Sequence, residues 1–341
     1  MPNEELKAFS KTRVGETLTR PVFIKAIEER PTKNGDLYLT FTLLDGEGEC
    51  SANYFSTNAA QQQERGITAG IVAEVTVTVR DYKGGKSFNI DSIAPYTGDE
   101  FTVGDFIVTP PIDVNVMYDD MIASLHACGD DRGGTAKPLS DLAVMILEKY
   151  KAEFLHSSAA VSMHHNFKGG LIYHSYRIVK AADAICDVYP ELDRELLMSA
   201  AAIHDIGKIW EYSTDAIGSS EVTGSGVLFG HIYMGAKLVS GFADRYYAEN
   251  KDAPRFVDEK VRLLTHMILS HHGVREWGAV ATPAIPEAFA LHYLDSIDAK
   301  INSCEKEFSK LRPGEITKKT PFGFDGKMYK PAYKEKAGDN K

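Results

Sequence analysis

The sequence predicts a multidomain protein of mixed class, a small β-barrel followed by an all-α domain. Apolar and polar side chains alternate with the two-residue period of strands from about Val14 to Tyr96. After Pro110 and Pro111, apolar residues recur with helical spacing. A length of 341 residues allows each domain a hydrophobic core. We expect four segments: the barrel over residues 1–98, a linker over residues 99–113, the helical domain over residues 114–312, and a basic, aromatic tail over residues 313–341.

The β-region reads as a set of short strands. Residues 37–43 alternate strictly and place four apolar side chains on one face, Leu37, Leu39, Phe41 and Leu43. Residues 71–80 repeat the pattern and turn at residues 83–86 into a strand over residues 87–91, which predicts a hairpin. Several strands within about 80 residues, interrupted by a polar insertion at residues 57–66, indicate a small closed barrel, and the OB-fold is the best candidate.

The second faces of these strands are polar and carry Tyr38, Arg80 and Tyr82. Aromatic rings can stack on bases and an arginine can contact phosphate, as in OB-folds that bind single strands. These three residues are therefore candidate nucleic-acid contacts. The alternative is an ordinary solvent-exposed sheet face, and the residues alone leave both interpretations open.

Beyond the linker, the periodicity predicts seven helices, over residues 115–127, 138–157, 170–188, 193–207, 230–248, 258–271 and 285–311. Two loops rich in glycine and polar residues separate them, at residues 129–138 and 215–226. The second loop is long enough to form a mobile flap near a site.

The net charge of −10 is unevenly distributed. Residues 99–305 carry 17 basic and 30 acidic residues, whereas residues 306–341 carry 10 basic and 5 acidic residues. An acidic body suits cation binding, because bound metals offset negative charge, although most of these acids are expected on a solvated surface. Any contact with RNA must therefore be local.

The basic tail interleaves its lysines with Phe322, Phe324, Tyr329 and Tyr333. Such a segment could bind single-stranded RNA through charge and stacking. The alternatives are an arm packed on another subunit, which would imply a homo-oligomer, and a disordered terminus.

The four cysteines lie far apart, without a Cys-X-X-Cys pair. This spacing argues against a disulfide framework and against a cysteine zinc site, and it fits a reducing compartment. The chain opens without a signal-peptide pattern, and its apolar runs fall short of the about 20 residues that a membrane span needs. We expect a cytoplasmic protein that does not contact membranes.

One pair of residues organises the helical part, His204-Asp205 in the segment Ile-His-Asp-Ile-Gly-Lys. A neighbouring imidazole and carboxylate can bind one metal pair, with the carboxylate bridging two ions. The dipeptide alone is common. Its significance comes from residues that follow in a fixed order inside or beside predicted helices: His174 before it, and His231, His271, His272 and Asp295 after it.

That order is the signature of HD-domain metal phosphohydrolases. Residues 169–175 (Gly-Gly-Leu-Ile-Tyr-His-Ser), the His204-Asp205 core and residues 270–273 (Ser-His-His-Gly) resemble the HD half of the YhaM family. Members of that family are bacterial 3′-to-5′ exoribonucleases with an N-terminal OB-fold. The resemblance extends over roughly residues 15–312 and implies the same two folds here.

The resemblance also implies a dinuclear centre. It assigns His174, His204, Asp205 and Asp295 to the first metal, and it makes Asp205 the bridge to a second metal bound by His231, His271 and His272. Asp298, one helical turn after Asp295, is the alternative ligand. Mixed His and carboxylate ligands suit transition metals, with Mn²⁺ the first choice and Fe, Co, Zn or Ni as alternatives.

Two further residues are candidates for direct catalytic roles besides Asp205. Lys208 follows Asp205 by three residues and could hold a substrate phosphate or stabilise the transition state. Its alternative role is that of a lysine at a helix C-terminus. His165 resembles part of the family's His-rich lead-in and is a candidate phosphate contact or proton donor to the leaving 3′ oxygen.

The predicted function is metal-dependent hydrolysis of single-stranded RNA to nucleoside 5′-monophosphates, and its 3′-to-5′ polarity rests on the resemblance alone. Single-stranded DNA could also be a substrate, because charge and stacking serve both polymers. The alternative is a phosphohydrolase of a small nucleotide, such as a cyclic dinucleotide, a dNTP or an alarmone. The cyclic-dinucleotide enzymes carry Gly-Tyr-Pro after their paired histidines, where this chain has residues 274–276, Val-Arg-Glu.

Overall fold

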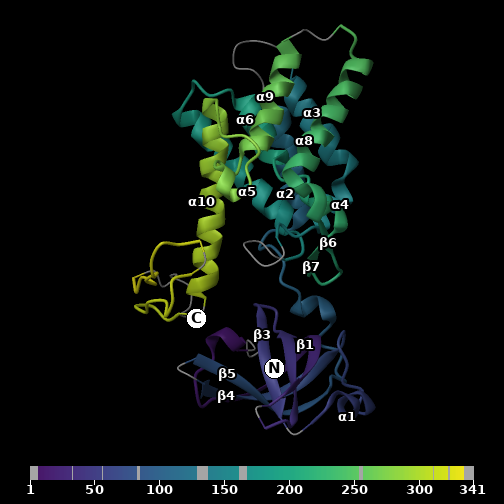
Figure 1. Cartoon of the computed structure of the whole chain (residues 1–341), viewed down its shortest axis with the longest axis vertical. Helices are drawn as coiled ribbons and strands as arrows, with labels where there is room; N and C mark the ends of the chain where they lie inside the picture. Colours follow the sequence, from purple (N-terminus) through teal and green to yellow (C-terminus); the bar gives the residue numbers. More distant parts are fainter. Residues whose placement is uncertain are drawn as a thin grey trace. The chain divides into compact units, whose positions relative to one another are not determined.

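The protein is described by a computed structural model (Figure 1), which covers residues 7–32, 34–55, 57–82, 85–128, 137–160, 167–252, 256–309, 311–321 and 323–333. The chain divides into two compact units. One unit comprises residues 1–108 together with residues 306–341, and the other comprises residues 109–305.

The first unit contains a closed barrel of five strands in the order β1-β2-β3-β5-β4. The strands are β1 (Thr17–Pro31), β2 (Leu37–Leu44), β3 (Glu49–Phe55), β4 (Val72–Tyr82) and β5 (Gly85–Pro95). All neighbours are antiparallel except β3 and β5, which pair in parallel. A five-stranded barrel with a crossover of this kind is an OB-fold, so the predicted fold of the N-terminal domain is confirmed.

The apolar side chains that alternate along β2 fill the barrel interior, as the sequence predicts. Leu39, Phe41 and Leu43 are fully buried. Leu37 shares their face but is exposed, because it begins β2 at the rim, opposite the last residue of β1. The polar insertion after β3 forms the short helix α1 (Ala59–Glu64), which is capped by the side chain of Asn58.

The second unit is helical. Its helices are α2 (Val114–Ala127), α3 (Pro138–Lys149), α4 (Lys151–His156), α5 (Gly170–Val188), α6 (Arg194–Ile203), α7 (Lys208–Glu211), α8 (Gly224–Glu249), α9 (Phe256–Ser270) and α10 (Pro286–Phe308), of which α10 continues into the first unit. Helix α6 packs against α3, α5 and α9, and its side chains from Glu195 to Ile203 are all buried. A helix that is buried on all sides lies inside the fold. The residues that follow α6, His204 and Asp205, therefore also lie in the interior.

The structure corrects three predicted boundaries. The helix expected over residues 138–157 is broken at Tyr150, and the helix expected over residues 193–207 ends at Ile203. The loop expected over residues 215–226 instead belongs to a hairpin of β6 (Tyr212–Thr214) and β7 (Ser220–Val222), followed by the first turn of α8. Asp215 holds the hairpin turn by accepting hydrogen bonds from the backbone N–H groups of Ile217 and Ser219.

The described tail residues fold back on themselves. Ile316 and Tyr329 form an antiparallel bridge, and Lys330 donates to the carbonyl groups of Phe308 and Leu311. Tyr329 and Tyr333 are exposed, whereas Phe322 lies outside the described residues. In the part of the chain that the structure describes, no helix is both long and apolar enough to cross a membrane.

Candidate metal centre

The predicted metal-binding residues converge in the helical unit. His174 lies in the first turns of α5, and His204 and Asp205 lie in the turn between α6 and α7. The others come from α8 (His231), from the residues that follow α9 (His271 and His272) and from α10 (Asp295). Residues that are up to 121 positions apart in the sequence thus face one another inside one fold.

Each of the five imidazoles is held through its Nδ1 atom by an oxygen acceptor. The acceptors are the Asp298 carboxylate for His174, the Ala201 carbonyl for His204, the Glu211 carboxylate for His231, the Ile268 carbonyl for His271 and the Trp277 carbonyl for His272, at 2.7 to 3.0 Å. A carbonyl or ionised carboxylate only accepts, so Nδ1 carries the hydrogen and Nε2 presents a lone pair. This is the arrangement in which histidine binds metals.

The carboxylate of Asp205 lies between two sets of these lone pairs. Its Oδ1 atom is 3.4 Å from His231 Nε2 and 3.5 Å from His271 Nε2. Its Oδ2 atom is 3.4 Å from His204 Nε2 and 3.5 Å from His174 Nε2. Each carboxylate oxygen therefore faces one pair of imidazoles.

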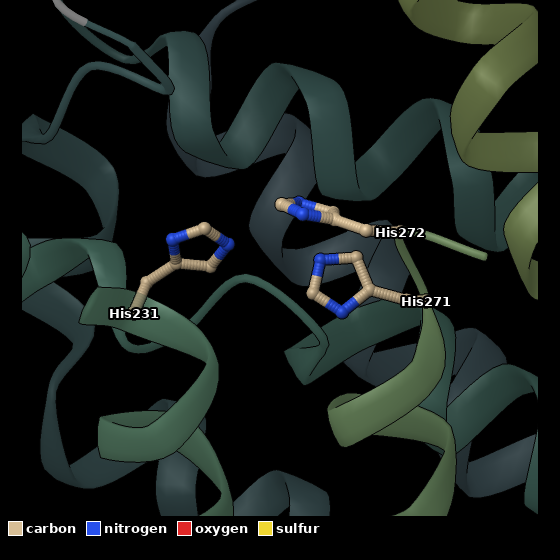
Figure 2. Close-up of side chains that lie close together, drawn as sticks. All are labelled: His231, His271 and His272. Atoms are coloured by element: carbon tan, nitrogen blue, oxygen red, sulfur yellow. The ribbon is translucent and has the colours of Figure 1, made fainter. Parts of the chain in front are cut away.

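The second set of imidazoles is shown in Figure 2. The rings of His231, His271 and His272 approach from α8 and from the end of α9, and their ligand atoms all lie within 4.8 Å of one another. His174, His204 and Asp205 form a second group with the same property. Both groups are deeply placed, although His272 is only half-buried.

The donor set fits divalent cations. Asp205 Oδ1, His231 Nε2 and His271 Nε2 are buried without a hydrogen-bond partner among the described residues. His174 Nε2 and His204 Nε2 lie 3.3 Å apart, close enough to share one proton or to bind one cation. Buried polar atoms are rarely left unsatisfied, and a metal ion at each group would satisfy them.

The local charges also favour bound cations. Burial raises the pKa of Asp205, but the Lys208 ammonium and the His204 imidazole outweigh burial and hold it well below its usual range. Burial likewise opposes ionisation of Asp295, yet a hydrogen bond from His174 keeps its pKa low. Burial lowers the pKa of His174, but Asp295 and Asp298 raise it to about 9, so a cation that binds here would displace a proton from Nε2. Both carboxylates thus remain ionised as ligands.

Lys208 is the cation nearest to the bridge position. Its Nζ lies 2.6 Å from Asp205 Oδ2, and the residue is only 7% exposed. The predicted proximity to Asp205 is therefore observed. Lys208 begins α7, a helix of a single turn, so the alternative role at a helix C-terminus stays open.

Two orienting carboxylates were not assigned from the sequence, Glu211 and, in this role, Asp298. Asp295 Oδ1 lies 3.2 Å from His174 Nε2, whereas Asp298 binds His174 Nδ1 at 2.7 Å and Arg177 Nε at 2.8 Å. Glu211 binds His231 Nδ1 at 2.7 Å. The sequence signal for Glu211 is its position three residues after Lys208, on the same short helix.

Replacing Glu211 with alanine is expected to lower the affinity for metal by about 10- to 100-fold, because His231 loses the acceptor that fixes its tautomer and ring orientation. Glu211→Gln retains an acceptor oxygen and should lose less. Titration calorimetry with Mn²⁺ measures both affinities. An alanine variant that binds Mn²⁺ like the unmodified chain would contradict this role.

The remaining predicted residues are not part of this cluster. His165 lies outside the described residues. Tyr38 is the second residue of β2, opposite Arg30 near the end of β1, and stacks on Phe55 with ring centroids 5.2 Å apart. Arg80 and Tyr82 are exposed near the end of β4, at its hairpin with β5, so the barrel candidates form two separate patches.

Comparisons with known proteins identify relatives of this chain. The HD domain family matches residues 171–300. The chain is 32% identical over 322 residues to a Bacillus subtilis protein named 3′-5′ exoribonuclease YhaM, a match that covers 94% of this chain and 96% of the relative. A Geobacillus protein of the same name is 30% identical over 321 residues, which is 94% of each chain. The second OB-fold domain of replication protein A from Methanococcus maripaludis matches 28% of this chain and 98% of its own, with 15% identity and a TM-score of 0.20.

The helical fold and the His204-Asp205 core with its surrounding histidines define the class of HD-domain phosphohydrolases, whose members depend on divalent metals. Within that class, the matches to the Bacillus and Geobacillus proteins, which cover 94% of this chain, show the family. The chain belongs to the YhaM family.

Proposed function

We propose that this protein is a metal-dependent exoribonuclease that removes nucleoside 5′-monophosphates from the 3′ end of single-stranded RNA. The observation that carries the proposal is the match, over nearly the whole chain, to relatives named 3′-5′ exoribonuclease, combined with a cluster of buried metal-type ligands. Single-stranded DNA is proposed as a second substrate, because charge and stacking act on both polymers.

The proposed centre holds two divalent ions that share Asp205, which is supported by the placement of its two oxygens toward different imidazole pairs. The proposed ligands of the first ion are His174, His204, Asp205 and Asp295. Those of the second are Asp205, His231, His271 and His272. The mixture of nitrogen and oxygen donors favours Mn²⁺ among the candidate metals over ions that prefer all-oxygen shells. Bound ions of this kind lower the pKa of water and stabilise charge on a phosphate group.

Lys208 is proposed to hold the scissile phosphate. An ammonium group has three N–H donors, and only the contact with Asp205 Oδ2 at 2.6 Å engages one of them among the described residues. The others can donate to a phosphate oxygen as its negative charge increases in the transition state. His165 remains the proposed phosphate contact or proton donor to the leaving 3′ oxygen.

The barrel is proposed to bind the upstream part of the RNA through Tyr38, Arg80 and Tyr82. Replacing Tyr38 with alanine should raise the KM for a long RNA, because the stacked pair with Phe55 loses one ring and stacking contributes about 1–3 kcal/mol per base. The effect on a dinucleotide is expected to be smaller. Steady-state kinetics on both substrates test this, and an equal loss on both would remove the proposed role of the barrel.

The proposed reaction is tested with a chelator-stripped chain and an RNA oligomer labelled at its 5′ end. A ladder of products shortened by one nucleotide at a time is the expected result when Mn²⁺ is restored, because removal from the 3′ end leaves the 5′ label on the shortened strand, whereas removal from the 5′ end releases it. Immediate release of the labelled mononucleotide would contradict the polarity. If none of Mn²⁺, Mg²⁺ or Zn²⁺ supports a ladder, the small-nucleotide alternative replaces this proposal.

A further inference from the structure

Helix α8 presents an exposed face that the metal centre does not use. Tyr233 and Lys237 are one turn apart and lie on the same side of the helix beyond its kink at Gly230, and Phe229 lies just before the kink. The rings of Phe229 and Tyr233 are 55% and 48% exposed, and their centroids lie 5.7 Å apart. Exposed aromatic pairs are unusual on a solvated helix surface.

The same face borders a groove between α7 and α8, with a volume of about 400 Å³. We call it the α8 groove, and its lining includes Trp210, Met234, Lys237, Leu238, Phe242 and Arg245. The Arg245 guanidinium lies 5.1 Å from the centre of the Phe242 ring. The groove thus combines an indole, a thioether and two cations.

The α8 groove adjoins the metal centre through the backbone. Helix α7 begins with Lys208, beside Asp205, and reaches Trp210 two residues later. Helix α8 carries His231 on the opposite side from Tyr233. The two helices are so close near Gly207 that a Cβ atom there would lie 2.0 Å from the His231 carbonyl oxygen and 2.9 Å from the Gly235 nitrogen. Met234, which lines the groove, follows His231 by three residues, so the groove begins about one helical turn from the metal centre.

The charge of the groove favours an anionic ligand. Residues 99–305 carry a net charge of −13, yet the described residues that line the groove include two cations and no carboxylate. Asp244, on the same helix, faces a different cavity, toward α9. Local cations with interleaved aromatic rings are suited to the phosphates and bases of a single strand.

We propose that the α8 groove, extended by Phe229 and Tyr233, binds the single-stranded RNA immediately upstream of the scissile linkage. This inference rests on the proposed function and adds a second RNA-binding surface, on the catalytic unit itself. From Tyr233 to Arg245 the helix rises about 18 Å, which corresponds to about five nucleotides at a stacked spacing of about 3.4 Å. Lys237 and Arg245 contact phosphates, and Trp210 and Tyr233 contact bases.

Tryptophan fluorescence reports on this groove directly. The chain has two tryptophans, so Trp277→Phe leaves Trp210 as the single indole, and the barrel contributes none. The experiment titrates the Mn²⁺-loaded, full-length Trp277→Phe chain with hexauridylate whose 3′-terminal linkage is a non-hydrolysable methylenephosphonate. We expect saturable quenching of Trp210, because a base that stacks on an indole quenches it. Absence of quenching at RNA concentrations that saturate binding, measured by anisotropy of a labelled strand, overturns the proposal.

The charge contacts are tested by Lys237→Glu combined with Arg245→Glu. The Kd read from Trp210 should rise at least about tenfold, and the slope of log Kd against log salt should fall by about 1.4, since each phosphate contact contributes about 0.7. Lys149→Glu combined with Arg262→Glu makes the same change of charge at other exposed positions and should leave both quantities unchanged. Equal effects of the two double variants would show a general charge effect and overturn the proposal.

A competing occupant of this face is a second copy of the chain, because Val227 and Leu228 beside it are 76% and 75% exposed. Sedimentation of the Lys237→Glu, Arg245→Glu variant tests this, and a changed oligomeric state would overturn the RNA assignment. Failure of the proposed function is distinguishable, because quenching of Trp210 does not require hydrolysis. Quenching of Trp210 without a product ladder would support RNA binding in the α8 groove and contradict the proposed exonuclease activity.

Discussion

Replacing Asp205 with alanine is expected to lower the rate of RNA hydrolysis by about 1,000-fold or more. Among the residues that the structure describes, Asp205 alone faces both imidazole pairs, through its two oxygens, so its loss removes one ligand from each group. A metal centre contributes several kcal/mol of transition-state stabilisation, and about 4 kcal/mol corresponds to about 1,000-fold in rate. Single-turnover hydrolysis of a labelled RNA oligomer measures the loss.

The alanine variant also leaves the Lys208 ammonium buried without its partner, and breaking a buried pair in this way costs about 3–5 kcal/mol of folding stability. Loss of activity must therefore be separated from loss of fold. Asp205→Asn retains the volume and one acceptor oxygen, and its circular dichroism and bound metal should be measured alongside. Asp244→Ala removes an exposed carboxylate and serves as the control. A folded Asp205→Asn chain that keeps most of the activity and both metals would refute the bridging assignment.

Gly207→Ala is expected to cause the largest loss of stability of any methyl-sized change at the centre. Its backbone conformation, with φ −61° and ψ −18°, suits any residue, so the effect is purely steric. The added Cβ atom would meet the His231 carbonyl oxygen at 2.0 Å, and neither backbone can give way without displacing His231 or Asp205. Overpacking of this kind costs about 3 kcal/mol, which for a unit of this size lowers Tm by roughly 6–12 °C.

Gly241→Ala is the matched control for that substitution. Gly241 lies inside α8, and a Cβ atom there would meet nothing within 4 Å. Replacing a helical glycine with alanine stabilises by up to about 1 kcal/mol. Thermal unfolding should therefore move in opposite directions for the two variants. A Gly207→Ala chain with an unchanged Tm would show that α7 and α8 separate easily, contrary to the close contact described above.

The barrel interior was predictable from the alternation of residues 37–43, because one face of each strand must be buried. The strand order was not predictable on physical grounds. The parallel pairing of Ala52 with Phe88 and of Asn53 with Asn89 joins strands that are separated by a helix and a third strand. Only the identification of the fold from its general pattern supplied that topology.

The positions of the predicted metal residues were available from their order in the sequence, since each lies within or beside a strongly periodic helix. Their orientation was not. The Nδ1 partner of His174 lies 124 residues away, and that of His231 lies 20 residues away, so neither contact has a local signature. The end of α6 at Ile203 was also missed, because the expected helix was continued to Gly207, whereas residues 204–207 form a buried turn.

The hydrogen-bond acceptors of the five Nδ1 atoms bear on the order of folding and metal binding. In small zinc domains the ligands are free until the ion arrives, so metal uptake and folding are a single event and chelation unfolds the chain. Here, backbone carbonyls and two carboxylates hold the rings by contacts that do not involve an ion. The polypeptide can therefore fold first and acquire its ions afterwards. A shortage of metal would then inactivate folded molecules reversibly. The same molecules would regain activity when metal is restored, without new protein synthesis.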